Sequence, residues 1–161
     1  MSKKLILFLT GICFWGSIAI GSDKPKDTST IHCVALNIYY ETSAKSKVEA
    51  MAITDVVMNR VKDVRYPSTP CDVILQARLY RSGEPIPNKC QFSWFCDGKP
   101  DTPRNDKAWY KSVKWAYEFV QEGKYHGLTD GATHYHATYV SPSWSRKLTR
   151  MSRIDRHIFY K

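Results

Sequence analysis

Acidic residues are scarce in this chain. Its 161 residues include 15 Asp and Glu against 24 Lys and Arg, which gives a net charge of +9. The chain also lacks internal repeats and low-complexity segments, which excludes a repeat array and a disordered protein. Hydrophobic residues make up 43% of the chain and aromatic residues 13%. These values predict one globular domain with a hydrophobic core.

Long apolar runs are also few, and the single one lies at the start. Residues 1–21 begin with Lys3 and Lys4, continue as an apolar run and end in the small-residue pattern Ala19-Ile20-Gly21. This pattern is typical of a secretory signal peptide. The run is slightly shorter than the roughly 20 residues of a stable membrane span, so a weak signal anchor is the alternative.

Removal of residues 1–21 would delete two lysines and no acid, so the net charge would fall from +9 to +7. We therefore expect a soluble, basic, monomeric protein in the periplasm or the extracellular wall, with membrane contact only through the N-terminal segment. Cell-wall polymers are the polyanions available there, and nucleic acid is a poorer candidate partner. The alternative is that the charge only keeps the protein soluble.

Cysteines are few, and they lack the paired Cys-x-x-Cys units of a structural zinc site. Four follow the signal segment, at Cys33, Cys71, Cys90 and Cys96. An even number in an exported chain predicts two disulfides, and three pairings are open. We favour Cys33–Cys71 together with Cys90–Cys96, and we do not expect a catalytic thiol.

The rest of the chain reads as helix followed by a small amount of strand. Polar residues 22–30 predict a linker, and residues 31–161 are the expected folded domain. Apolar spacing and capping residues predict helices over 31–42, over 46–63, and from Asn105 or Asp106 to Gly123. The remaining segments are expected as one or two helical turns over 72–79, a loop over 81–89, an ordered loop over 90–104, and extended chain over 133–140 and 152–161. The predicted class is α+β, mostly helical.

Glu41 is the first candidate for chemistry. It ends the aromatic run Ile38-Tyr39-Tyr40 of the first predicted helix. Poor solvation there would raise the pKa of its carboxyl group, as a general acid near neutral pH requires. The alternative is a structural glutamate that pairs with backbone amides or with an arginine such as Arg60.

Two further segments carry candidate binding residues. A disulfide between Cys90 and Cys96 would close a small loop that holds Phe92 and Trp94 for stacking on sugar rings. The polar residues Gln91 and Ser93 alternate with these aromatic residues and would bind the polar rims of the sugars. The alternative is that these aromatic residues belong to the core.

The segment Gly131–Ala137 places His134 and His136 on one side of a predicted strand and Tyr135 between them. Two histidines could ligate a metal, but no third ligand or HExxH motif accompanies them. We therefore predict no metal and no cofactor. We expect instead that one histidine lines a substrate cleft and the other is bonded in the core. His134, Tyr135 and His136 are all kept as candidate substrate-binding residues.

Several motifs in order resemble the cell-wall hydrolase family of the spore-cortex-lytic enzymes, above all its signal-bearing members from Gram-negative bacteria and phages. They cover about Ile31 to Lys161 and read CVALNIYYET, AMAITDVVMNRV, YPSTPCDVI, CQFSWFCDG, GATHYHATYVSPSW and RIDRHIFYK. The resemblance implies a lysozyme-like domain similar to lytic transglycosylases, with peptidoglycan as substrate.

The catalytic glutamate of the family's IYxEARGE motif corresponds to Glu41. The chain departs directly afterwards, because ETSA stands where EARGE is usual and the second glutamate is absent. It departs again at Asp155, where the family usually has Gly.

The resemblance implies cleavage between N-acetylmuramic acid and N-acetylglucosamine, with 1,6-anhydromuramic ends and Glu41 as the single catalytic carboxylate. Other carboxylates are present, but no motif fixes them opposite Glu41: Glu49, Asp55, Asp97 and Asp101. The alternatives are a muramidase that uses water, an N-acetylmuramoyl-L-alanine amidase, a wall-binding module without activity and, more distantly, an exported nuclease. Both wall remodelling and phage lysis fit as roles, with a slight preference for lysis.

Overall fold

The computed structural model describes residues 28–161, so the predicted signal segment lies outside the described residues. The four helices there are α1 (Thr28–Thr42), α2 (Lys47–Val61), α3 (Pro70–Ile74) and α4 (Asp106–Val120). The strands are β1 (Ala77–Leu79), β2 (Pro85–Cys90), β3 (His134–Ala137), β4 (Arg150–Ile154) and β5 (His157–Tyr160), and two 3-10 turns are η1 (Ser93–Cys96) and η2 (Ser143–Arg146).

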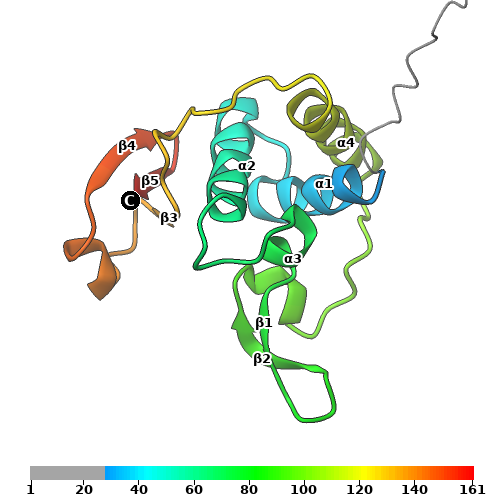
Figure 1. The fold of residues 1–161 in the computed structure, drawn as a ribbon. Coiled ribbons are helices and arrows are strands. Elements are labelled where there is room, and N and C mark those ends of the chain that lie inside the picture. Colours follow the sequence, from blue (N-terminus) through cyan, green and yellow to red (C-terminus); the bar gives the residue numbers. More distant parts are fainter. Residues whose placement is uncertain (1–27) are drawn as a thin grey trace, which may run out of the picture.

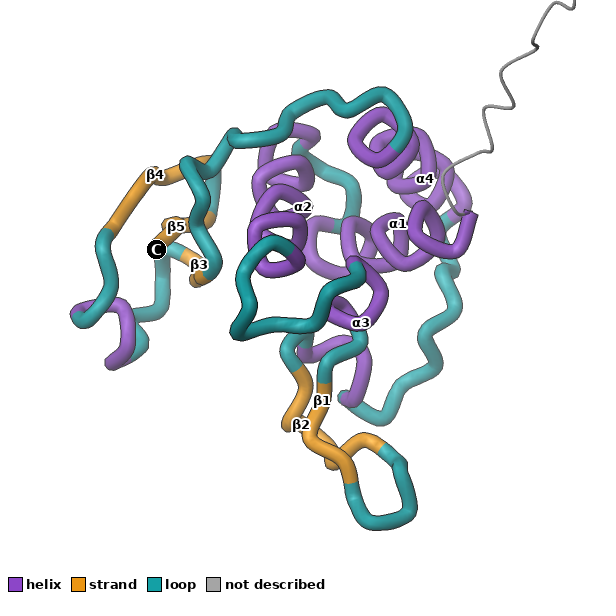
Figure 2. Tube along the Cα trace, in the orientation of Figure 1, coloured by secondary structure: helices purple, strands orange, loops and turns teal. Residues whose placement is uncertain are grey.

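Helix α2 lies between the two parts of the molecule, a helical part and a three-stranded sheet (Figure 1). Helices α1 and α4 pack together on one side of it, and α3 lies beneath them. The antiparallel sheet, in the order β3-β5-β4, lies on the other side, and the β1–β2 hairpin projects beyond α3 (Figure 2). This arrangement is the predicted α+β class with a mostly helical body.

The helices begin where side chains cap free backbone amides. Ser46 accepts a hydrogen bond from the amide of Glu49 at the start of α2, and Asn105 accepts one from the amide of Ala108 at the start of α4. Thr69 caps α3, whose first residue, Pro70, suits a position that needs no amide donor. These caps confirm the predicted starts of α2 and α4.

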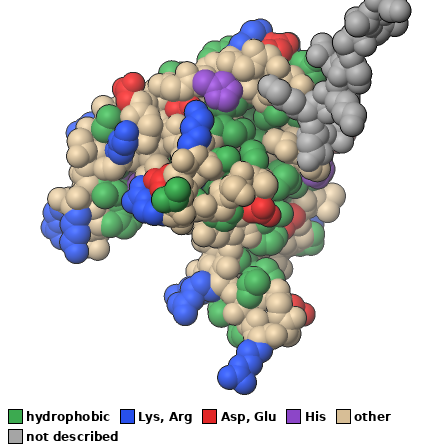
Figure 3. Space-filling view, in the orientation of Figure 1, with side chains coloured by type: hydrophobic (Ala, Val, Ile, Leu, Met, Phe, Trp, Pro, Cys, Tyr) green, Lys and Arg blue, Asp and Glu red, His purple; other side chains and the backbone are tan. Residues whose placement is uncertain are grey.

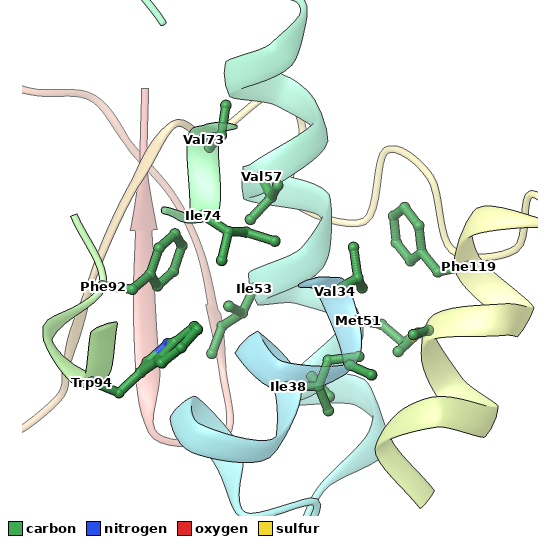
Figure 4. Close-up of a cluster of buried hydrophobic side chains, with 13 residues drawn as sticks. Val34, Ile38, Met51, Ile53, Val57, Val73, Ile74, Phe92, Trp94 and Phe119 are labelled. Carbon is green, nitrogen blue, oxygen red and sulfur yellow. The ribbon is translucent and has the colours of Figure 1, made fainter. Parts of the chain in front are cut away.

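The central position of α2 explains why its sequence is apolar on more than one side. Its residues Met51, Ile53 and Val57 join the main core with side chains from α1, α3, η1 and α4 (Figure 4). Ala52 and Val56 face the other way and pack with Ala132 and Phe159 of the sheet region in a second cluster. Each fully buried Val, Ile or Phe contributes about 1.5–3 kcal/mol, so α2 holds both parts together.

The register of the sheet decides which way the side chains of β3 point. Strand β3 pairs with β5 so that Tyr135 lies opposite Phe159, while His134 lies opposite Tyr160. Successive residues of a strand point to opposite faces. Phe159 is fully buried against α2, so Tyr135 shares the inner face, whereas His134 and His136 lie on the outer face.

Both predicted disulfides are present. Cys33 of α1 is joined to Cys71 of α3 with 5.5 Å between their Cα atoms, and Cys90 is joined to Cys96 with 6.1 Å between theirs. These separations are normal for disulfides. The first bond fixes α3 to α1, and the second holds η1 at the end of β2.

Three local predictions were wrong. Helix α1 begins at Thr28, within the predicted linker 22–30. The helical turns expected over 72–79 end at Ile74, and Ala77–Leu79 forms strand β1. The loop expected over 81–89 contains part of β2, Pro85–Cys90, which pairs with β1. Prolines obscured this hairpin in the sequence, because they are tolerated only where a strand lacks a second neighbour.

Exposed basic side chains lie on the projecting parts of the molecule (Figure 3). They include Arg146 and Lys147 at η2 and Arg78 and Lys89 on the hairpin. No helix within residues 28–161 is long and apolar enough to cross a membrane.

Candidate active site

Glu41 lies in the last turn of α1 and reaches the inner face of the sheet. The hydroxyl of Tyr135 donates a hydrogen bond of 2.9 Å to its Oε2 atom. The glutamate is half-buried. Among the described residues, no backbone amide or arginine nitrogen pairs directly with it, so the structural alternative considered for Glu41 is not what the geometry shows.

The surroundings of Glu41 change its acidity. Burial raises the pKa of its carboxyl group, while the hydrogen bond from Tyr135 and the charge of Arg60 act in the opposite direction. Burial also raises the pKa of Tyr135 well above its usual value, and the charge of Glu41 raises it further. The phenol therefore stays protonated and can donate to the carboxylate throughout the neutral range. A carboxyl group with a raised pKa and a fixed orientation is suited to general acid–base chemistry.

Arg60 supports this site from α2. Its Nε atom donates a 2.8 Å hydrogen bond to the carbonyl of Thr133, next to β3. Its guanidinium faces the amide of Gln91, whose oxygen accepts at 3.1 and 3.2 Å when turned toward it. Its side chain is buried, and its guanidinium carbon lies over the rings of Tyr66 and Phe92, 5.4 and 5.7 Å from their centroids. Arg60 thus ties β3 to the segment before η1, a role that the sequence did not reveal.

Two other carboxylates are committed to holding the fold. Glu49 is fully buried and binds His157 at 2.9 Å and the guanidinium of Arg156 at 3.1 Å. Asp55 is also buried and accepts hydrogen bonds from the amides of Gly127 and Thr129 at 2.8 and 2.9 Å. Both carboxylates are thus held by partners within the fold, and the charge of Glu49 also raises the pKa of Tyr135. Asp97 and Asp101 instead line a surface cavity together with Tyr39 and Tyr40 of α1.

The two histidines of β3 do not meet Glu41. The rings of His134 and His136 lie against Trp144 on the outer face, with ring centroids 5.4 and 5.6 Å apart. Tyr135 points inward. Both ring nitrogens of His136 are hydrogen-bonded. Nδ1 lies 2.9 Å from the carbonyl oxygen of Ala137, and Nε2 lies 3.0 Å from the hydroxyl of Tyr160. His134 is bonded at 3.0 Å to the hydroxyl of Thr133. The structure therefore brings only Tyr135 of these three residues to the glutamate.

The aromatic residues of the disulfide loop are largely internal. Phe92 is only 2% exposed and belongs to the main core, so it offers no face for a sugar, and the prediction that it stacks on substrate was wrong. Trp94 is 7% exposed and donates a 3.1 Å hydrogen bond to Asn37. Gln91 and Ser93 are exposed.

Comparisons with known proteins agree with this architecture. The catalytic domain of the germination-specific lytic transglycosylase SleB from Bacillus anthracis matches with a TM-score of 0.61 and 20% identity, over 86% of this chain and 98% of that domain. The catalytic domain of the SleB protein from Bacillus cereus matches with a TM-score of 0.57 and 20% identity, over 84% of this chain and 91% of the other. These likenesses confirm the predicted lysozyme-like fold.

A search of curated proteins found no match. The sequence profile of the family described as Cell Wall Hydrolase matches residues 44–160. This match begins just after Glu41, so it does not itself assign the glutamate. It covers most of the chain, and the chain therefore belongs to the cell wall hydrolase family.

Proposed function

We propose that this protein degrades peptidoglycan by cleaving the bond between N-acetylmuramic acid and N-acetylglucosamine, with Glu41 as its catalytic acid and base. The observation that carries the proposal is the half-buried Glu41 carboxyl group, whose pKa is raised by burial and which Tyr135 fixes by a 2.9 Å hydrogen bond. Membership of the cell wall hydrolase family supplies the substrate class.

A lytic transglycosylase reaction suits a site with one available carboxylate. The protonated Glu41 gives its proton to the glycosidic oxygen as the bond to muramic C1 breaks. Its carboxylate then accepts the proton of the muramoyl 6-hydroxyl, whose oxygen closes on C1. The products are a 1,6-anhydromuramic end and a free hydroxyl on N-acetylglucosamine, and Glu41 is protonated again. No water is consumed, so no second carboxylate is needed to activate one.

The supporting residues have separate roles in this proposal. Tyr135 holds the Glu41 carboxyl group in position and lowers its pKa relative to burial alone. Arg60 keeps β3 and Gln91 in place through its contacts with Thr133 and the Gln91 amide. Two exposed residues, Gln91 before η1 and Ser93 at its first position, are proposed to contact the glycan.

Release of soluble fragments from purified peptidoglycan tests the function. The wild-type protein should clear a suspension of wall sacculi, and Glu41→Gln should lose at least about 100-fold in rate, the low end of a general acid's contribution. Glu122→Gln, at an exposed position after α4, is the matched control and should keep full activity. Full activity of Glu41→Gln would reject the assignment.

A chelator separates the amidase alternative, which would need a metal. The proposed mechanism uses none, so excess EDTA should leave the rate unchanged. Loss of activity with EDTA and its return on adding zinc would favour an amidase instead.

A further inference from the structure

A surface cavity of about 340 Å³ lies beside the C-terminal end of α1. Its wall comes from α1, η1 and the loop before α4. The lining residues are Tyr39, Tyr40, Trp94, Asp97, Lys99, Pro100, Asp101, Thr102 and Arg104. Tyr40 and Glu41 are consecutive, so their Cα atoms lie about 3.8 Å apart. The cavity and the catalytic carboxyl group thus belong to the same end of one helix.

One wall of the cavity contains a stacked aromatic pair. The rings of Tyr40 and Trp94 are stacked, with centroids 4.9 Å apart and planes 18° from parallel. The Trp94 indole is fixed by its hydrogen bond to the buried Asn37. Aromatic walls of this kind suit the apolar face of a sugar ring.

The hydroxyl of Tyr40 lacks a hydrogen-bond partner among the described residues. Its Oη atom is covered from solvent. Such an unsatisfied group costs roughly 1–3 kcal/mol, so its presence at a cavity wall calls for an explanation. The neighbouring Tyr39 hydroxyl, by contrast, accepts from the amides of Arg104 and Asn105 at 3.1 Å each and anchors the loop.

Charged groups complete the cavity. Asp97 is held by the amide and the ammonium group of Lys99 at 2.9 and 3.1 Å. Asp101 is half-buried, and burial raises the pKa of its carboxyl group, with a further rise from the charge of Asp97. Carboxylates that face a cavity accept hydrogen bonds from sugar hydroxyls.

We propose that this cavity is a subsite that holds one N-acetylated sugar ring of the glycan strand next to Glu41. The sugar ring packs on Tyr40 and Trp94, and one of its hydroxyls donates to Asp101. The Tyr40 hydroxyl is covered from solvent, so a small shift of this side chain brings it to its missing partner on the sugar. Tyr40 stands at the unspecified position of the IYxE motif, so this contact is a feature of this chain. The inference rests on the proposed function, since it names where that substrate binds.

Binding to the full-length Glu41→Gln protein tests the subsite without turnover. The probe is a soluble oligosaccharide of N-acetylglucosamine, and its affinity for the protein is measured by calorimetry. Adding Tyr40→Phe or Asp101→Asn should weaken binding about fivefold each, the size of one hydrogen bond. Tyr110→Phe and Asp130→Asn, at exposed positions outside the cavity lining, are the matched controls and should bind as the parent does.

Folding is checked in the same variants. Tyr40→Phe removes an unsatisfied hydroxyl, so its thermal midpoint should equal or exceed that of the parent. Binding by both cavity variants as tight as that of the parent, or no binding of the oligosaccharide to the parent at all, would overturn the subsite. Binding of a free stem peptide in its place, weakened by the same two changes, would overturn the sugar assignment. Wall clearing by the wild-type protein reports separately on the proposed function, so the two failures are distinguishable.

Discussion

At the scale of single residues, the site depends on what each polar group has as a partner. Glu49 and Asp55 are buried and fully engaged by neighbouring groups, whereas Glu41 is half-buried and receives one hydrogen bond, from Tyr135. That difference is the structural basis on which Glu41, and not Glu49 or Asp55, is proposed as the reactive carboxylate. From the sequence, Glu41 was predicted as the candidate through its aromatic setting and the family motif, but the sequence could not show which of the other acids are bound by partners within the fold.

Tyr135→Phe tests the role of the hydrogen bond to Glu41. The bond stabilises the carboxylate, so its loss should raise the pKa of Glu41 above its already raised value. A general acid must be protonated, and activity falls as pH rises through its pKa. The fall in kcat/KM at high pH should therefore move to higher pH in the variant. Tyr139→Phe, which changes an 87% exposed residue, serves as the control. An unmoved profile would show that Tyr135 does not act on Glu41.

Asp155 illustrates strain at a single residue. It occupies the left-handed region, with φ of 47°, in the turn between β4 and β5, and it accepts a hydrogen bond from Ser46. Glycine adopts such a conformation without cost, which gives a physical reason for the glycine usual in the family.

Comparison of Asp155→Gly with Asp155→Ala isolates that strain. Both lose the bond to Ser46, but only alanine keeps a Cβ atom in the left-handed region. Asp155→Gly should therefore be more stable than Asp155→Ala by about 1 kcal/mol in urea denaturation. Equal stabilities would mean that the turn relaxes to another conformation.

At the scale of elements, local signals and non-local pairing differ in what a sequence can predict. Helices α2 and α4 carry caps and periodic apolar residues, so their extents were predicted to within a few residues. The β1–β2 hairpin was missed because its prolines argue against a strand. The alternation of β3 was predicted, but its direction was not, since only pairing with β5 decides that Tyr135 faces inward. The histidines were therefore assigned to the cleft without knowledge of the face they occupy.

The two disulfides should differ in their contribution to stability. Cys33–Cys71 spans 38 positions and Cys90–Cys96 spans 6. Loop-closure entropy predicts a loss of about 4 kcal/mol for the first and about 2 kcal/mol for the second when both cysteines of a pair become alanine. Denaturation of the two double variants measures both values. A larger loss for the short loop would show that its main effect is to hold η1, rather than to limit the unfolded chain.

At the scale of the whole molecule, the site lies where the two parts of the fold meet. Helix α1 supplies Glu41 and the sheet supplies Tyr135. Helix α2, which supplies Arg60, lies between the sheet and helices α1 and α4 (Figure 1). The family and the lysozyme-like fold were predicted from ordered motifs and are confirmed. The predictions of export, cleavage of residues 1–21, a monomer and a role in remodelling or lysis stay predictions.

The chemical nature of the product ends tests the central claim most directly. Purified peptidoglycan would be digested by the wild-type protein and by Glu41→Gln, and the soluble fragments identified by mass spectrometry. The single-carboxylate mechanism predicts fragments that end in 1,6-anhydromuramic acid, absent with the variant. Reducing muramic ends would contradict it and require a second carboxylate that activates water. Free peptides with intact glycan strands would contradict glycosidic cleavage altogether.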